Sequence, residues 1–133
     1  MTPRELITHY LAAAKRGDWD TAFGYFAEDI VVHIPGRSAF AGDPRGKDAA
    51  VGYIQAIRDH YSDGKIELDL IDMLTSDERV ALLVRERFHG EGPPAEIRRT
   101  NVYRVQGDEI VEISIFEADQ YVVDELLHHV EPR

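Results

Sequence analysis

The feature that most limits the fold of this chain is a change in hydrophobic period near residue 65. Before that point apolar residues recur mainly at helical spacing. After it, the segments 65–74, 79–89, 95–105 and 109–117 are rich in Ile, Val, Leu and Phe and are typical of strands. Only short stretches of turn residues separate these segments, so consecutive strands must run antiparallel. Helices followed by such a meander predict an α+β fold, with helices covering one face of a curved sheet.

The N-terminal segment carries clear helix signals. Thr2-Pro3-Arg4-Glu5 is a capping box with proline at the first helical position, and Gly17 supplies the stop. Asp18 then caps a second, short helix. Trp19 is expected to have a structural role in the corner between these two helices.

The middle of the chain predicts one strand and one more helix. A β-branched run at 30–34 ends at Pro35-Gly36, and a loop follows at 36–47. A helix is expected from about 48 to 60, and a last short helix at 120–128. A chain of 133 residues with this pattern predicts one domain, residues 1–133.

Composition excludes several classes of function. The formal net charge of −10 argues against a nucleic-acid partner and against anionic membrane surfaces. No apolar run approaches the roughly 20 residues that cross a bilayer. There is no cysteine, which excludes disulfides and thiolate chemistry, and we expect a cytoplasmic protein. Five arginines fall in one third of the chain: Arg85, Arg87, Arg98, Arg99 and Arg104. A local basic patch is one interpretation, and salt bridges on solvated strand faces are the expected one.

Several short motifs resemble one known family. They are Gly17-Asp18-Trp19-Asp20, 26–36, 40–42 with 45–48, 103–105 with 107–112, and 119–121 with 124–125. Together they are similar to the SnoaL-like proteins of the nuclear transport factor 2-like superfamily, over nearly the whole chain. The resemblance implies a cone-shaped, cystatin-like α+β barrel with one pocket for a small, largely apolar molecule. It also implies a homodimer formed through the outer face of the sheet.

The superfamily includes enzymes and non-catalytic proteins, so the fold alone does not decide the function. In ketosteroid isomerases a tyrosine and an aspartic acid act as hydrogen-bond donors, and matching the motifs places Tyr10 and Asn101 at those positions. Both side chains would then donate to an oxyanion in a low-dielectric pocket. The alternative is that Tyr10 is a core aromatic residue and Asn101 an ordinary polar strand residue.

The first strand lacks the expected base. The resemblance places Ile34 at the base position of the isomerases, which argues against ketosteroid isomerisation and makes Ile34 a pocket residue. His33 is adjacent and has a suitable pKa, but alternation points it to the opposite face unless a bulge before Pro35 turns it inward.

The last strand offers carboxylates. Ile113, Ile115, Glu117 and Asp119 share one side, and the resemblance implies that this side faces the cavity. A carboxylate near apolar walls has a raised pKa and can act as a general acid or base. Asp119 has an alternative role as the N-cap of the last helix.

The strand at 95–105 adds an inward cation. By alternation Arg99 shares a face with Ile97, Asn101 and Tyr103, where it would pair with Glu117 or polarise a substrate oxygen. Limonene-epoxide hydrolases use an aspartate–arginine–aspartate arrangement of this kind, of which fragments are visible here. Glu86 is a further candidate whose side of the strand the pattern leaves open.

Metal and phosphate sites are not expected. His89, His128 and His129 do not have the spacing of a metal site, and Gly90-Glu91-Gly92 predicts a hairpin turn rather than a phosphate loop. No cofactor is expected.

Three functions remain open. The first is a cofactor-free enzyme acting by proton transfer on a small hydrophobic substrate, by isomerisation, cyclisation, dehydration or epoxide opening. The second is a non-catalytic binder, and the third an interaction module. A homodimer is also predicted because both sides of the strand at 79–89 are apolar, with Val80, Leu82 and Val84 opposite Ala81 and Leu83.

Overall fold

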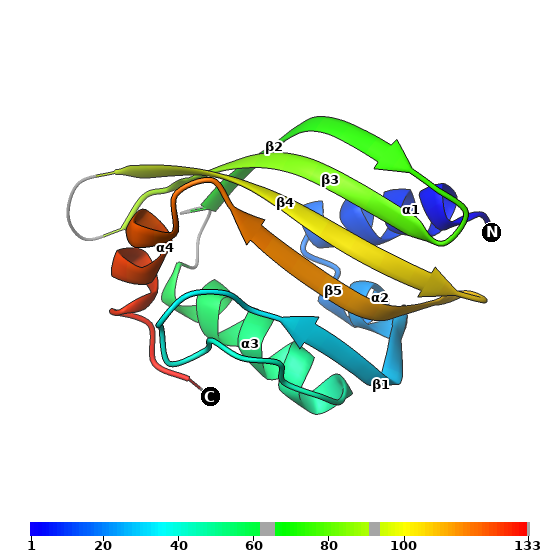
Figure 1. The fold of residues 1–133 in the computed structure, drawn as a ribbon, viewed down its shortest axis with the longest axis horizontal. Helices are drawn as coiled ribbons and strands as arrows, with labels where there is room; N and C mark the ends of the chain where they lie inside the picture. Colours follow the sequence, from blue (N-terminus) through cyan, green and yellow to red (C-terminus); the bar gives the residue numbers. More distant parts are fainter. Residues whose placement is uncertain (62–65, 91–93, 133) are drawn as a thin grey trace.

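The computed structural model describes residues 1–61, 66–90 and 94–132, as four helices and one five-stranded sheet within those ranges (Figure 1). In chain order the elements are α1 (Pro3–Lys15), α2 (Trp19–Gly24), β1 (Phe26–His33), α3 (Lys47–His60), β2 (Ile66–Thr75), β3 (Arg79–Phe88), β4 (Ala95–Gln106), β5 (Glu109–Glu117) and α4 (Gln120–Leu127). The predicted α+β fold is therefore confirmed. The three N-terminal helices pack on one face of the curved sheet, and the short C-terminal helix lies at one end of it.

The strands lie in the order β1-β5-β4-β3-β2. The neighbouring pairs from β2 to β5 are antiparallel, as the short turns predict. β1 instead joins β5 in parallel, with Val32 opposite Ile113. The expectation of an antiparallel sheet thus holds for four strands, and β1 makes the sheet mixed. A parallel pair needs a long connection, and here the loop, α3 and three strands supply it.

The helix signals of the N-terminus act as expected. The Thr2 hydroxyl accepts a hydrogen bond from the Glu5 backbone N–H at 3.1 Å, and Glu5 completes the capping box. Gly17 follows α1 with φ +77°, a conformation that glycine adopts without strain. Asp18 caps α2 by accepting from the backbone N–H of Thr21.

Strand β1 begins at Phe26, four residues before the predicted start. The polar pair Glu28-Asp29 interrupts the apolar pattern there, and both residues are exposed at the sheet edge. Trp19 lies at the predicted corner, with its ring 5.3 Å from that of Phe23. It is only half-buried, and the Arg58 guanidinium lies 4.3 Å above its ring.

Two clusters of buried side chains form the core. The larger one lies between the helices α1 and α2 and the sheet, and its fully buried members include Leu6, Ile7, Ile30 and Ile110. The smaller one lies under α4, where Val123 and Leu127 pack with Tyr61, Phe88 and Ile97. The second cluster fixes α4 against the end of the sheet.

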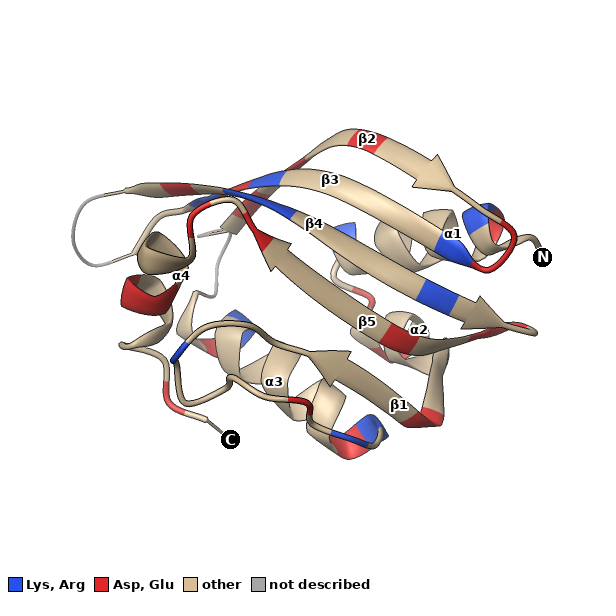
Figure 2. Cartoon of the chain, viewed as in Figure 1, with Lys and Arg blue, Asp and Glu red and all other residues tan. Residues whose placement is uncertain are grey.

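The outer face of the sheet carries an apolar band between charged ends. One row of the band contains Leu74 on β2, Ala81 on β3 and Val102 on β4. The next row contains Leu83 on β3 and Phe116 on β5. The middle of β3, β4 and β5 is accordingly free of charged residues in Figure 2, and charges lie toward the strand ends. Of these residues Leu74 and Phe116 are 53% and 58% exposed.

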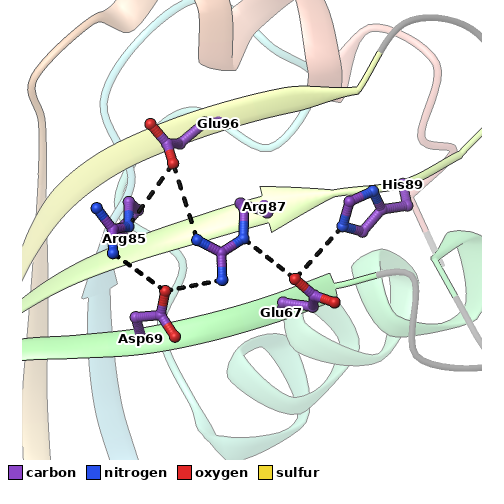
Figure 3. Close-up of polar contacts among 6 residues, drawn as sticks. All are labelled: Glu67, Asp69, Arg85, Arg87, His89 and Glu96. Atoms are coloured by element: carbon purple, nitrogen blue, oxygen red, sulfur yellow. Dashed lines mark hydrogen bonds and ion pairs between the residues drawn. The ribbon is translucent and has the colours of Figure 1, made fainter.

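One charged end of this face forms a continuous set of ion pairs, which we call the outer lattice (Figure 3). Its members are Glu67, Asp69, Arg85, Arg87, His89 and Glu96. Arg87 donates to Glu67 at 3.1 Å and lies 2.9 Å from Asp69. At the other end of the face Arg104 donates to Glu112 at 3.0 Å. The predicted salt bridges are thus present for Arg85, Arg87 and Arg104, whereas Arg99 lies on the inner face.

Two further observations concern the chain as a whole. In the part of the chain that the structure describes, no helix is long and apolar enough to cross a membrane. The predicted turn at Gly90-Glu91-Gly92 includes residues outside the described ranges.

Candidate functional site

The inner face of the sheet and the helices enclose a cavity of about 1120 Å³. Helix α1 contributes Tyr10 to its wall, α3 contributes Tyr53, and β1 contributes Val32. Strands β4 and β5 add Tyr103, Ile113 and Ile115. The volume exceeds the few hundred Å³ of a small ligand, and aromatic and branched side chains form most of this inner wall.

The cavity opens across the edge strand β2. Consecutive residues of a strand point to opposite faces, yet Glu67, Leu68 and Asp69 all line the cavity. The space therefore extends past the edge of the sheet. Exposed charged residues, among them Lys15 and Asp59, surround this opening.

Three charged side chains meet on the inner face of the sheet, and we call them the buried triad: Glu86, Arg99 and Glu117. Arg99 Nε and Nη2 donate to the two carboxylate oxygens of Glu117 at 2.9 and 2.7 Å. Arg99 Nη1 lies 3.7 Å from Glu86 Oε1. The side chains are 11%, 11% and 3% exposed for Glu86, Arg99 and Glu117. Glu86 and Arg99 line the cavity, whereas Glu117 is held behind Arg99.

Burial sets the electrostatics of the triad. It raises the pKa of Glu117, a shift that Arg99 opposes and the negative charge of Glu86 reinforces. Burial alone would lower the pKa of Arg99, but Glu86 and Glu117 outweigh it and raise this pKa, so Arg99 remains a cation. One guanidinium is thus shared by two carboxylates, one of which has an increased affinity for a proton.

Uncharged polar groups line the rest of the inner wall. Burial raises the pKa of the Tyr10, Tyr53 and Tyr103 hydroxyls, so each is protonated at neutral pH and can donate a hydrogen bond. The rings of Tyr10 and Tyr103 lie 5.7 Å apart. The side-chain oxygen of Asn101 is buried and has no hydrogen-bond partner among the described residues. The arrangement can therefore hold a ligand by hydrogen bonds and stabilise a negative charge on it through Arg99.

A family model, that of the SnoaL-like domain, matches residues 7–113. The chain belongs to the SnoaL-like family. An uncharacterised protein of Mycobacterium tuberculosis is 31% identical over 116 residues, which cover 86% of this chain and 88% of that protein. This relative carries no assigned activity that transfers to the present chain.

Solved structures agree with the SnoaL-like assignment. Bal32a, from a soil-derived mobile gene cassette, has a TM-score of 0.85 and 26% identity, covering 93% of this chain and 95% of that one. A protein of unknown function with a cystatin-like fold, from Xanthomonas campestris, has a TM-score of 0.86 and 23% identity, covering 96% and 98%. An NTF2-like protein from Burkholderia thailandensis has a TM-score of 0.81 at 23% identity, covering 94% and 96%. The last two likenesses establish the fold alone.

Most of the site residues predicted for a SnoaL-like protein lie on the cavity wall. These residues are Tyr10, Arg99, Asn101, Tyr103, Ile113 and Ile115. Ile34 is buried on the same side of β1 as Val32, but Val32 is the β1 residue that lines the cavity. Glu117 faces inward as predicted and reaches the cavity only through Arg99. The chemical roles of all these residues stay predictions.

His33 and Asp119, by contrast, lie away from the SnoaL-like cavity. His33 follows ordinary alternation and points to the outer face, so the bulge that would turn it inward is not formed. Its ring nitrogens lie 2.6 Å from Asp43 Oδ1 and 2.6 Å from Glu112 Oε2, and these contacts raise the pKa of His33. Asp119 caps α4 by accepting from the backbone N–H groups of Tyr121 and Val122, which is its alternative role.

The sequence patterns did not predict Tyr53 as a site residue, and they did not decide on which face of β3 Glu86 lies. Tyr53 shares a helical stripe with Ala50 and Ile57, three residues before it and four after, so the period of α3 contains the signal. Glu86 shares the inner face with Val80, Leu82 and Val84 by simple alternation. That side was ambiguous because the opposite residues of β3 are apolar too.

Proposed function

We propose that this SnoaL-like protein is a cofactor-independent enzyme that moves a proton on a small, largely apolar molecule. The reaction would be of the isomerase, cyclase, dehydratase or epoxide hydrolase type. The observation that carries this proposal is the buried triad beside a cavity walled by aromatic and aliphatic side chains. Buried charge is costly, and its retention beside a cavity favours a functional use.

Each group of the site has a role in this proposal. The Arg99 guanidinium polarises a carbonyl or epoxide oxygen and stabilises the negative charge that develops on it. Glu117, whose pKa burial raises, supplies or accepts the proton once its pair with Arg99 loosens and its carboxyl group turns to the cavity. Tyr10 and Asn101, which also line the cavity, hold the polar atom of the substrate by hydrogen bonds.

The test is a reaction screen with the wild-type protein and matched variants. Small cyclic ketones are followed for exchange of their α-protons in D₂O by NMR, and small epoxides for conversion to diols. For any substrate that turns over, Glu117→Gln should lower the rate about a hundredfold or more. Tyr10→Phe should cost at most about 2.7–4 kcal/mol in the barrier, the scale of one oxyanion donor.

Glu109→Gln is the control, because Glu109 is exposed and the substitution changes the net charge equally. Full turnover by both Glu117→Gln and Tyr10→Phe would contradict the proposed roles.

A second candidate is a non-catalytic binder, and one contact favours it. Both oxygens of Glu117 are already held by Arg99, so a proton transfer would require this pair to loosen. The first strand carries Ile34 where a base would otherwise stand. A ligand that binds in the cavity and is recovered unchanged after long incubation would support the binder over the enzyme.

We also propose a homodimer through the outer face of the sheet. The support is its apolar band, in which Leu74 and Phe116 are more than half exposed. Charged residues at both ends of the band would set the register of two copies. Sedimentation that gives a monomer of 15.1 kDa at micromolar concentration would contradict the dimer.

A further inference from the structure

The charges of the buried triad do not balance. Arg99 is the cation of the buried triad, and its two closest contacts are with the oxygens of Glu117. Arg87, which follows Glu86 on β3 and also lines the cavity, is engaged by Glu67 and Asp69 in the outer lattice. Arg58, another cation of the cavity wall, lies over the Trp19 ring. With all three groups of the triad ionised, the triad carries one net negative charge.

Of the two carboxylates in the triad, Glu86 is the one that lines the cavity. The residue is 9% exposed and lines the cavity. Among the described residues its carboxylate has an ion pair with Arg99 at 3.7 Å, which is beyond hydrogen-bond distance, and no hydrogen bond is found for it. A buried carboxylate without hydrogen bonds is unfavourable unless a further donor or cation reaches it. Such a donor or cation can reach Glu86 from the cavity.

Asn101 provides an independent observation of the same kind. Its side-chain oxygen is buried without a hydrogen-bond partner among the described residues, although the Asn101 amide group also interacts with the Tyr103 hydroxyl, and the residue lines the same cavity. Because buried acceptors are nearly always satisfied, this oxygen also indicates a ligand with N–H or O–H groups. Neither the Glu86 carboxylate nor the Asn101 oxygen would favour a ligand whose polar atoms are all hydrogen-bond acceptors.

The aromatic wall suits a cation as well. Tyr10, Tyr53 and Tyr103 line the cavity, as does Trp19, whose ring already has the Arg58 guanidinium over it. Aromatic faces attract ammonium groups, most strongly where water is excluded. The same rings accommodate an apolar body, so charge and hydrophobic surface can be bound together.

We propose that the ligand of this cavity is a hydrophobic amine, bound as the ammonium cation with Glu86 as its counter-ion. The inference rests on the proposed function only in that the cavity is a ligand site, and it names the substrate class of that site. Glu86 anchors the ammonium group, and Arg99 with Glu117 remains available for the proton-transfer step. The N–H groups of the ligand also reach acceptors such as Asn101.

The test compares three probes of one shape by titration calorimetry at pH 7. They are 1-adamantylmethylamine, 1-adamantanemethanol and 1-adamantanecarboxylate, which are a cation, a neutral molecule and an anion. We expect the amine to bind about tenfold or more tightly than the alcohol, and the carboxylate to bind more weakly than both. Glu86→Gln, which keeps the shape of the side chain, should reduce the affinity for the amine to that for the alcohol.

The Glu109→Gln variant distinguishes an effect of the Glu86 carboxylate from an effect of the protein's net charge. A protein of net charge −10 attracts any cation, and this exposed substitution lowers that charge as much as Glu86→Gln does. The amine should therefore keep its advantage in Glu109→Gln. The melting temperatures of both variants show whether each is folded.

The outcomes are distinct. Equal binding of amine and alcohol by the wild-type protein, or an unchanged amine preference in folded Glu86→Gln, would overturn the amine inference and leave the cavity as a ligand site. If none of the three probes binds, the cavity is not a site for compact apolar ligands, and the proposed function falls with the inference.

Discussion

The two faces of the sheet carry arginine–carboxylate clusters that differ mainly in their access to water. In the buried triad, Arg99 Nη2 lies 2.7 Å from Glu117 Oε2, and the two side chains are 11% and 3% exposed. In the outer lattice, Arg87 Nη2 lies 2.9 Å from Asp69 Oδ2, and the exposed fractions are 36% and 41%. The contacts have nearly the same length, so an energetic difference between them must come from their surroundings.

This comparison shows why contact distance alone is a weak guide to function. On the outer face water screens the half-exposed Arg87 and Asp69, and such a pair contributes little to stability. On the inner face the same groups have lost their hydration, so their attraction is strong and the loss of one partner is costly. A ligand that reaches Glu86 and Arg99 meets charges that are largely shielded from water.

The largest expected effect comes from removing one arginine on each face. Arg99→Met should lower the free energy of unfolding by about 3–5 kcal/mol, because two buried carboxylates are left without a cation. Arg87→Met should lower it by less than about 1 kcal/mol, because its partners remain hydrated. Urea denaturation followed by circular dichroism measures both. Equal losses would show that burial does not distinguish the two faces.

A smaller effect should appear in the titration of two glutamates, both paired with arginine. Burial raises the pKa of Glu117. Hydrogen bonds from Arg87 and His89 lower the pKa of the exposed Glu67. For Glu117 the contribution to stability is greatest at acid pH and declines as the pH rises through its folded pKa. For Glu67 the contribution is present above its unfolded pKa and is lost as the pH falls.

NMR of ¹³C-labelled glutamate carboxyl groups checks these directions. We expect Glu117 to titrate above, and Glu67 below, the normal range for glutamate. Assignment of each signal comes from the Gln variants. A Glu117 carboxyl that titrates below the normal range would mean that Arg99 outweighs burial, and it would weaken its proposed role in proton transfer.

The smallest expected effect concerns His33, whose side chain is as exposed as those of the outer lattice. Asp43 first, and then Glu112, raise the pKa of His33, and Arg104 is bound to Glu112 on the next strand. A raised histidine pKa stabilises the fold fully below the unfolded pKa, and this contribution is lost as the pH rises through the folded pKa. The side chain is 39% exposed, so we expect less than about 1 kcal/mol.

Unfolding free energies measured from pH 5 to 9 test this contribution. The wild-type protein should lose stability over the upper part of that range relative to His33→Gln. Parallel curves for the two proteins would show that His33 gains nothing from its two carboxylates.

The sequence predicted most of the fold because its signals are local. The capping box at Thr2, the N-cap at Asp18 and the short turns between the last four strands each act within a few residues. The parallel pairing of β1 with β5 has no such signal, because it joins residues far apart in the chain. The early start of β1 was missed because Glu28 and Asp29 do not look like strand residues.

The site was predictable where alternation alone decides it. Arg99 and Glu117 share a face of neighbouring strands, and pairing them required only the register of β4 and β5. The face of the sheet on which Glu86 lies could not be predicted, because β3 carries apolar residues on both sides. His33 and Asp119 were candidates by residue type, and only the three-dimensional structure places them outside the cavity. That Glu117 lies behind Arg99 is a matter of side-chain packing, which no sequence pattern contains.

The parallel pairing of β1 and β5 also has a consequence for synthesis on the ribosome. Val32 is translated 81 residues before its partner Ile113. At a synthesis rate of about 5–20 residues per second, β5 is made roughly 4–16 s after β1. Both residues line the cavity, so the wall cannot close on the nascent chain before β5 emerges. Until then the apolar side chains of β1 lack their strand partner, and a chaperone that binds short extended segments would find its best target there.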